Sequence, residues 1–295
     1  MSKYIVSCSS TVDLDNDFLK KLDVHYISFH YQLNNSDYKD DLGLSLSSKD
    51  FYNMMREGAQ TKTSQVNVSE YIDFFTPFLE NGNDILHIEL SSGLSGSFNS
   101  ANVAANMLKE KFPNNKIIII DSLAASAGYG LLIDKVAELR QSGLTIDEVS
   151  NWITSNRLKL HHWFYSTDLS YYVKGGRITQ TAGFVGSILH LCPLLNVNDQ
   201  GKLIPRFKVI GKKRVMDRIV LQMQKHADNG LAYDGKCFIS HADCLEDALI
   251  VSKKVEDAFP NLNGKVEIFN IGTTIGSHTG PGTLALYFFG DERDE

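Results

Sequence analysis

Three short polar segments of this chain carry hydroxyl, glycine and histidine residues next to apolar stretches. They are residues 61–65, 91–97 and 276–282. The second segment, Ser91-Ser92-Gly93-Leu94-Ser95-Gly96-Ser97, lies between an expected strand and an expected helix. A strand end that leads into a helix presents free backbone N–H groups and the positive end of the helix dipole, and this combination binds anions. The alternative is that Ser95 or Ser97 only caps the helix, with nothing bound there.

A second chemistry that these segments allow is ester hydrolysis, with Ser95 as the nucleophile and His278 as the base. The run Gly93-Leu94-Ser95-Gly96-Ser97 lacks the final glycine of a nucleophile elbow. Because the chain contains nine histidines, the presence of a suitable base carries little weight. We therefore keep a serine esterase as the alternative to a binding protein without catalytic residues.

The composition excludes several classes of protein. The 295 residues are 43% hydrophobic and carry a formal charge of −6, which is typical of a globular chain and argues against a general nucleic-acid-binding protein, because phosphate contact needs a concentrated positive face. We find no apolar run long enough to span a membrane and no signal peptide, so we expect a cytoplasmic protein. The four cysteines form no Cys-x-x-Cys pair and are typical of free thiols in a reducing compartment.

Motifs for metals and nucleotides are incomplete. The acidic run at 13–17 resembles the start of a calcium loop, but Phe18 occupies the position that needs glycine. His161 and His162 point to opposite faces if they lie on a strand, so they cannot share a metal ion. No glycine-rich nucleotide fingerprint follows a strand. We expect neither a metal site nor a cofactor.

The elements that position the polar segments alternate between strand and helix in the first half of the chain. Capping boxes at Ser47 and Thr145 mark two helix starts, and Pro77 predicts a kink or an early helix end. Strand and helix in alternation predict a parallel, doubly wound, Rossmann-like sheet. We expect strands at 4–7, 24–33, 84–90 and 116–121, and helices at 51–57, 71–79, 97–111, 124–141 and after Thr145.

The pattern changes after about residue 159. Asp199-Gln200-Gly201 is typical of a tight turn between two antiparallel strands, so we expect a mixed sheet in the second half. The fold class is therefore α/β with two domains, 1–158 and 159–295. We expect strands at 161–166, 194–198, 203–209, 236–241, 265–270 and 284–289, and helices at 179–190, 211–229 and 244–259.

Four motifs resemble the DegV family of bacterial proteins, in the same order across nearly the whole chain. They are Thr-Ser-Gln at 63–65, Ser-Ser-x-Leu-Ser-Gly at 91–96, Lys-Gly-Gly-Arg-Ile at 174–178 and His-Thr-Gly-Pro-Gly at 278–282. The resemblance implies a lipid-binding protein of the two-domain EDD fold. A long-chain fatty acid such as palmitate, stearate or oleate would lie in a tunnel between or beside the domains. Some members present this ligand to a fatty acid kinase, which forms an acyl phosphate for phospholipid metabolism.

The resemblance also assigns roles to five residues of this sequence. Thr63 and Ser95 would donate hydroxyl hydrogen bonds to the fatty acid carboxylate, and His278 would stand beside it. Gly280 would let the backbone approach the head group, and Arg177 would line the mouth or the surface that meets a partner.

The chain departs from the family pattern at two places. Cys8-Ser9 replaces the usual Asp-Ser after the first strand, and Val66 replaces the proline that often follows Thr-Ser-Gln. We expect the first change to alter a hydrogen bond under the head group and the second to loosen the loop.

Apolar helices and a basic cluster complete the expected site. The helix at 179–190 and the stretch 123–132 are candidates for the tunnel wall, although ordinary core packing explains them equally well. The basic cluster is either a solvated helix face or a docking surface for an acidic partner or for anionic membrane lipid. Its members are Arg206, Lys208, Lys212, Lys213, Arg214 and Arg218.

Overall fold

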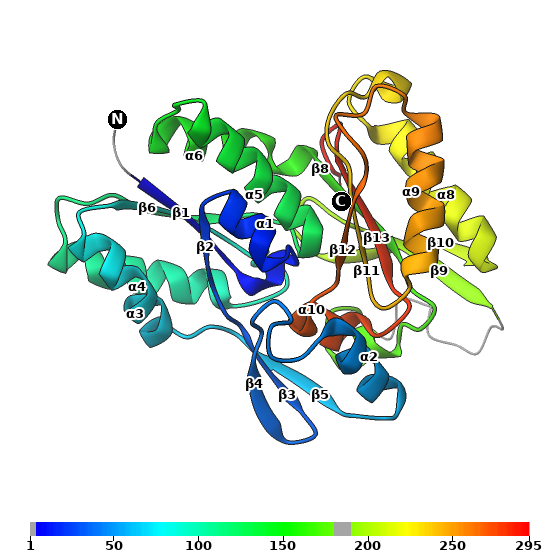
Figure 1. Cartoon of the computed structure of the whole chain (residues 1–295), viewed down its shortest axis with the longest axis horizontal. Coiled ribbons are helices and arrows are strands. Elements are labelled where there is room, and N and C mark those ends of the chain that lie inside the picture. The colour runs from blue at the N-terminus through cyan, green and yellow to red at the C-terminus, as the bar shows by residue number, and fades with distance from the viewer. Residues whose placement is uncertain (1–3, 180–189, 295) are drawn as a thin grey trace.

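The computed structural model describes residues 4–179 and 190–294, and its strands form three sheets (Figure 1). The four-stranded sheet has the order β2 (Val24–Ile27), β1 (Tyr4–Ser9), β6 (Asp84–Glu89), β7 (Ile117–Asp121). The six-stranded sheet has the order β10 (Leu203–Ile210), β9 (Leu191–Val197), β8 (Leu160–Tyr165), β13 (Leu284–Phe289), β11 (Phe238–His241), β12 (Glu267–Asn270). A small sheet has the order β4 (Ser36–Lys39), β3 (His30–Leu33), β5 (Thr61–Ser64).

The four-stranded sheet confirms the parallel, doubly wound prediction. All its strand pairs are parallel. Helices α3 (Val68–Glu80) and α4 (Ser97–Lys111) lie on one face, and α5 (Ser126–Gln141) and α6 (Ile146–Asn156) on the other (Figure 1). Ile118 and Ile119 are only partly buried, because β7 is an edge strand of this sheet.

The six-stranded sheet confirms the mixed sheet predicted for the second half. Strands β9 and β10 form the expected antiparallel hairpin, and β11 and β12 pair in parallel. Helices α8 (Lys212–His226) and α9 (Leu245–Ala258) cover one face of this sheet. Helix α5 contacts β8, β11 and β13 on the other face, and one apolar core includes residues from both large sheets. The two halves are therefore joined through α5.

The remaining helices are short or peripheral. They are α1 (Asn16–Lys21), α2 (Ser48–Arg56), α7 (Ser170–Lys174) and α10 (Thr273–Thr279). Helix α10 contacts β3 and β5 of the small sheet. In the part of the chain that the structure describes, no helix has the length and apolar character needed to cross a bilayer.

The single strand expected at 24–33 is wrong, because β2 and β3 belong to different sheets. The chain leaves the first sheet at Phe29, whose backbone N–H donates to Ser10 Oγ (3.0 Å) and whose carbonyl accepts from the N–H of Asp40 (2.8 Å). These bonds take the backbone of Phe29 out of the ladder. An uninterrupted apolar pattern does not reveal such a change of sheet.

Two helix predictions concern Pro77 and the segment 179–190. Helix α3 does not end early at Pro77 but continues to Glu80, because its buried Tyr71, Phe75 and Leu79 anchor it to the core. The helix expected at 179–190, with wall residues Ala182, Phe184, Val185, Ile188 and Leu189, falls at 180–189 outside the described residues.

Candidate ligand-binding site

A cavity of about 310 Å³ lies between the two halves of the molecule. Its walls come from the segment after β6, the start of α5, strands β8 and β13, and helix α10. It therefore lies beyond the carboxyl end of β6, which is where open α/β sheets bind ligands. The volume is at the small end of the range of about 300–1,000 Å³ that ligand pockets occupy.

Most of the surface that lines this cavity is apolar. It includes no Asp or Glu among the described residues, so a carboxylate ligand meets no like charge in this wall. Such a cavity suits a hydrocarbon chain, because binding removes the apolar surfaces of both the chain and the cavity wall from water. The large apolar residues of the lining are Phe29, Leu90, Leu94, Phe164, Val197, Leu203, Ile271 and Ile275.

Four of the sequence-predicted residues line this cavity: Thr63, Ser95, Arg177 and His278. Thr63 lies on β5, which is tied to α10 by a hydrogen bond from Thr61 Oγ1 to a backbone carbonyl (3.4 Å). His278 lies on α10, and its Nε2 is 2.7 Å from Thr63 Oγ1 although 215 residues separate the two. The small sheet and α10 thus bring distant parts of the chain into direct contact.

The hydrogen bonds of His278 determine the direction in which Thr63 donates. Arg177 can only donate, so its Nη1, at 3.3 Å, leaves His278 Nδ1 as an acceptor. The ring proton is therefore on Nε2, which donates to Thr63 Oγ1. Because Thr63 accepts this bond, its own hydroxyl proton remains available for a ligand.

Ser95 is oriented in a similar way. The backbone N–H of Ser97 donates to Ser95 Oγ (3.2 Å), which leaves the Ser95 hydroxyl proton free for a ligand. The segment offers fewer free backbone N–H groups than the sequence predicts. The N–H groups of Ser92, Gly93 and Ser95 already donate to acceptors within the protein. The side-chain hydroxyls therefore provide donors in addition to the backbone amides at the start of α4.

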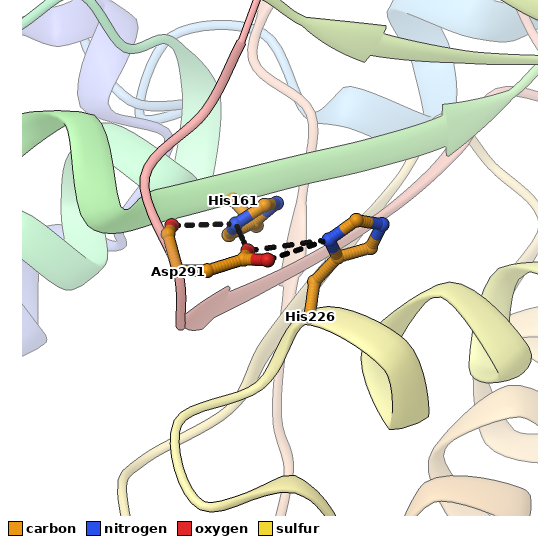
Figure 2. A group of neighbouring side chains, drawn as sticks. All are labelled: His161, His226 and Asp291. Carbon is orange, nitrogen blue, oxygen red and sulfur yellow. Dashed lines mark hydrogen bonds and ion pairs between the residues drawn. The ribbon is translucent and has the colours of Figure 1, made fainter.

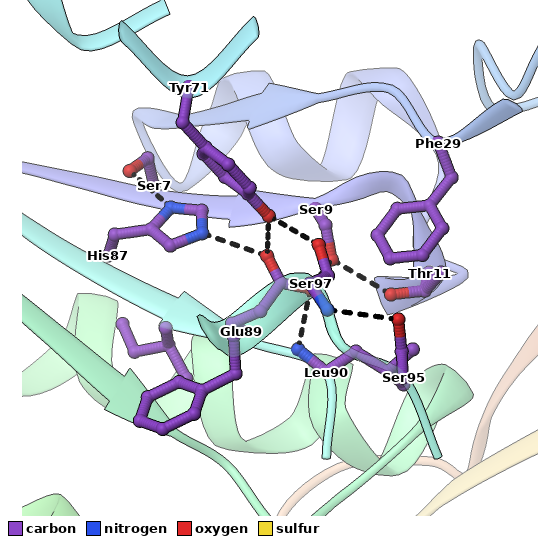
Figure 3. A network of polar contacts seen from close by, with 12 residues as sticks. Ser7, Ser9, Thr11, Phe29, Tyr71, His87, Glu89, Leu90, Ser95 and Ser97 are labelled. Atoms are coloured by element: carbon purple, nitrogen blue, oxygen red, sulfur yellow. Dashed lines mark hydrogen bonds and ion pairs between the residues drawn. The ribbon is translucent and has the colours of Figure 1, made fainter. Parts of the chain in front are cut away.

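A buried polar network supports the segment from behind (Figure 3). Glu89 is fully buried and accepts from Ser9 Oγ (2.8 Å), Tyr71 OH (2.5 Å) and His87 Nε2 (2.9 Å). Since Tyr71 donates to Glu89, its oxygen accepts from the hydroxyl of Ser97 (2.7 Å). The network therefore holds the residue whose N–H orients Ser95. Sequence reasoning missed it, although His87 and Glu89 alternate within an apolar strand and so share one face.

Arg177 adds a positive charge at the same place. It donates to the carbonyls of Leu94 (Nη2, 2.9 Å) and Gly175 (Nη1, 2.6 Å), which bind the guanidinium without neutralising it. Among the described residues, no carboxylate forms an ion pair with it, and burial lowers its pKa. Burial also lowers the pKa of His278 to about 4, so this imidazole is neutral at pH 7. An anion beside Arg177 would balance an otherwise unpaired charge.

A second cavity of about 580 Å³ adjoins the first. Thr63, Arg177 and His278 line both cavities. Lys62 and Lys174 add positive charge to the second one, and its described lining contains no Asp or Glu. The shared residues therefore separate an apolar chamber from a cationic one.

Two glycines have different relations to this site. Gly280 lines neither cavity; its φ of +68° ends α10, and a side chain there would collide with the ring of Tyr171. Its positive φ and close packing explain the glycine without a ligand. Gly175 was missed by sequence reasoning, but a Cβ at this position would lie 2.2 Å from His278 Nδ1. The first glycine of the Lys-Gly-Gly-Arg motif therefore lets the backbone pass close to the His278 ring.

The arrangement does not fit the esterase alternative. A catalytic histidine accepts the serine proton on one ring nitrogen and is oriented by a carboxylate on the other. Here the two ring nitrogens of His278 contact Thr63 and Arg177 instead. A guanidinium occupies the place where the orienting carboxylate would stand.

Much of the basic cluster is engaged within the protein. Arg206 Nε donates to Asn196 (2.8 Å), Lys212 pairs with Asp247 (2.5 Å), and Arg218 lies over the ring of Phe207. Lys213 and Arg214 at the start of α8 are exposed. The positive surface available to a partner is therefore smaller than the sequence indicates.

Comparison with known proteins identifies the family. The sequence profile described as an uncharacterised protein of the DegV family matches residues 5–291. The chain is 37% identical to a DegV domain-containing protein of Clostridium perfringens, over 100% of both chains. It belongs to the DegV family.

Solved DegV structures have the same fold. A DegV lipid-binding protein of Thermotoga maritima is 25% identical, with a TM-score of 0.85 over 99% of this chain and 100% of that one. The fatty acid kinase B3 protein of Streptococcus pneumoniae, solved with linoleic acid, is 22% identical, with a TM-score of 0.84 over 98% of this chain and 100% of that one.

The two departures from the DegV motifs lie in well-packed surroundings. Cys8 is fully buried on β1, and burial raises the pKa of its thiol. The neighbouring Ser9 keeps a hydrogen bond to Glu89. Val66 is fully buried in the core that contains Phe75, so the loop after β5 retains an apolar anchor at this position.

Proposed function

We propose that this DegV protein binds a long-chain fatty acid in the cavity between its two halves. The hydroxyls of Thr63 and Ser95 donate to the carboxylate, Arg177 supplies the compensating charge, and the tail lies along the apolar wall. The observation that carries this proposal is the set of hydrogen bonds that leaves both hydroxyl protons free beside an unpaired guanidinium. The description of one solved DegV relative as a lipid-binding protein and the linoleic acid bound to another support it.

The energetics of such a ligand divide between its two ends. Each methylene buried in the chamber contributes about 0.8 kcal/mol, so the tail supplies most of the affinity. A bare carboxylate is costly to bury, and charge-assisted hydrogen bonds offset that cost. A site with donors at one end and apolar residues along the rest meets both requirements.

We further propose that the protein has no catalytic residues of its own and presents the carboxylate to a fatty acid kinase. The kinase would reach the head group through the cationic cavity, which shares Thr63, Arg177 and His278 with the apolar chamber. The name of one solved relative, the fatty acid kinase B3 protein of Streptococcus pneumoniae, supports this role. Division of the chain into domains 1–158 and 159–295 would place the ligand at their junction.

Native mass spectrometry of the protein purified from cells tests the ligand. We expect a bound species whose added mass equals a long-chain fatty acid, and extraction should release palmitate, stearate or oleate. Only unliganded protein, combined with no binding of added palmitate or oleate, would contradict the proposal. Labelling of Ser95 by a serine-reactive phosphonate, with measurable ester hydrolysis, would favour the esterase instead.

The kinase role has a separate test. A DegV protein loaded with oleate should support acyl phosphate formation by a bacterial fatty acid kinase, and reversal of charge at Lys62 should reduce this activity without changing oleate affinity. Charge reversal at Lys213 tests whether the exposed basic residues of α8 also contribute. Binding to anionic vesicles, compared with neutral ones, tests membrane-surface contact as the alternative use of that face.

A further inference from the structure

A second group of chemically competent side chains lies on the other face of the six-stranded sheet. Along β8, His162 points toward the fatty acid cavity, whereas its neighbour His161 points toward α8. His161 is joined there by His226 at the end of α8 and by Asp291 after β13 (Figure 2). Strand β8, helix α8 and the segment after β13 thus contribute one residue each to a cluster that has no role in the proposed fatty acid site.

The three side chains direct their ligand atoms at one another. His161 Nε2 lies 2.8 Å from one Asp291 carboxylate oxygen, and His226 Nδ1 lies 3.2 Å from the other. One nitrogen from each ring and one carboxylate oxygen all fall within 4.8 Å of one another. The backbone carbonyl oxygen of Asp291 is also near, at 2.9 Å from His161 Nε2. Four atoms that can act as metal ligands, two ring nitrogens and two oxygens, therefore lie close together.

The surroundings hold the two imidazoles in place while leaving access from solvent. The His161 ring stacks on Phe288 and on His226, with ring centres 5.1 Å apart in each pair. Only 5% of the His161 side chain is exposed, compared with 33% for His226 and 58% for Asp291. Stacking thus preorganises the buried His161 ring and the partly exposed His226 ring, and the exposed carboxylate can rotate to accommodate an ion.

We propose that His161, His226 and Asp291 bind a divalent transition metal of the zinc type. Two imidazole nitrogens and a carboxylate are donors that suit such ions, and the carbonyl of Asp291 or a water molecule would complete four-coordination. The carboxylate at present accepts hydrogen bonds from both rings. On binding, each neutral ring carries its proton on the other nitrogen, and the metal replaces these two hydrogen bonds.

The site has a structural consequence for the end of the chain. Just after Asp291, the backbone N–H of Arg293 donates to Leu158 O (2.9 Å), and its guanidinium donates to Leu123 O (3.0 Å). These partners lie near the junction between the two halves. A metal ion would fasten this returning segment to β8 and α8, so its role is to stabilise the fold rather than to act on the fatty acid.

Titration of the full-length, chelator-treated protein with zinc tests this proposal. Calorimetry and metal analysis should give one ion per chain, and zinc should raise the melting temperature. His226→Ala and Asp291→Asn should each weaken binding at least about tenfold, since even residues that only support a metal ligand cost about 10- to 100-fold. His25→Ala, which removes an exposed histidine on β2, is the matched control and should leave zinc binding unchanged.

Either of two results would overturn the proposal: no zinc binding by the chelator-treated protein, or equal zinc affinity in the wild type and both cluster variants. The second result would place the ion elsewhere, for example at cysteine. The three residues would then form only a hydrogen-bonded clamp. Oleate binding should be the same in all these variants, so the outcome is independent of the fatty acid proposal.

Discussion

At the scale of single residues, the site depends on which atom carries each proton. Arg177 cannot accept a hydrogen bond, and this fact determines the direction of donation through His278 to Thr63. Ser97 has the same effect on Ser95. Both hydroxyls are therefore prepared to donate before a ligand arrives, which lowers the cost of ordering the site on binding.

This orientation predicts the effect of removing either hydroxyl. Thr63→Ala and Ser95→Ala should each weaken palmitate binding by about 1–3 kcal/mol, because the carboxylate loses a charge-assisted hydrogen bond. Isothermal titration or displacement of a fluorescent fatty acid measures the change. Ser64→Ala is the control, since Ser64 is exposed on the same strand. Wild-type affinity in both hydroxyl variants would exclude the proposed head-group contacts.

Acid should destabilise the fold through His278. Its pKa is lowered by burial to about 4 from an ordinary value of 6.5. Between these values the unfolded chain binds the proton more readily than the folded one, so stability is full above pH 6.5 and falls as the pH drops towards 4. Thermal melts should show a smaller loss over this window in His278→Gln than in the wild type. An identical pH dependence would show that His278 does not titrate in this way.

At the scale of elements, helix α5 connects the two large sheets. Its Gly128 faces the second sheet so closely that a Cβ would lie 2.4 Å from His162 Nε2 and 2.5 Å from a ring carbon of Tyr287. His162 and Tyr287 also line the cavity. The packing of α5 thus determines how closely the two halves lie together and the shape of the cavity.

This close packing predicts the result of adding a methyl group. Gly128→Ala should lower the free energy of unfolding by about 1–3 kcal/mol through overpacking, despite the better helix propensity of alanine. Denaturant unfolding measures the change. Gln141→Ala, at the exposed end of the same helix, should have little effect. A Gly128→Ala variant as stable as the wild type would mean that α5 can move away from β8 and β13.

At the scale of the whole molecule, the cavity exists because two sheets of different type meet around α5. Neither half encloses it alone: Leu90 and Ser95 come from the first, and Phe164 and Ala285 from the second. The small sheet adds Thr63 on β5. Under the proposed function, ligand binding should therefore hold the two halves together.

The sequence predicted the sheets better than it predicted the details of the site. Periodic apolar runs located most strands and helices, and the two capping boxes marked helix starts correctly, because these signals are local. Strand β5 and helix α10 were missed, since Thr61–Ser64 and Thr273–Thr279 are too polar to show such periodicity. Yet these two elements place Thr63 and His278 in contact.

By itself, the sequence determined the fold class, the family motifs and the residue types proposed to hold the head group, because these depend on local pattern and on chemical identity. The tertiary structure alone decided that His278 orients Thr63, that Glu89 supports Ser95 through Tyr71 and Ser97, and that Gly280 packs against a ring instead of lining a cavity. The physical reason is that a hydrogen bond acts over about 3 Å in space, whereas its partners here lie up to 215 residues apart along the chain.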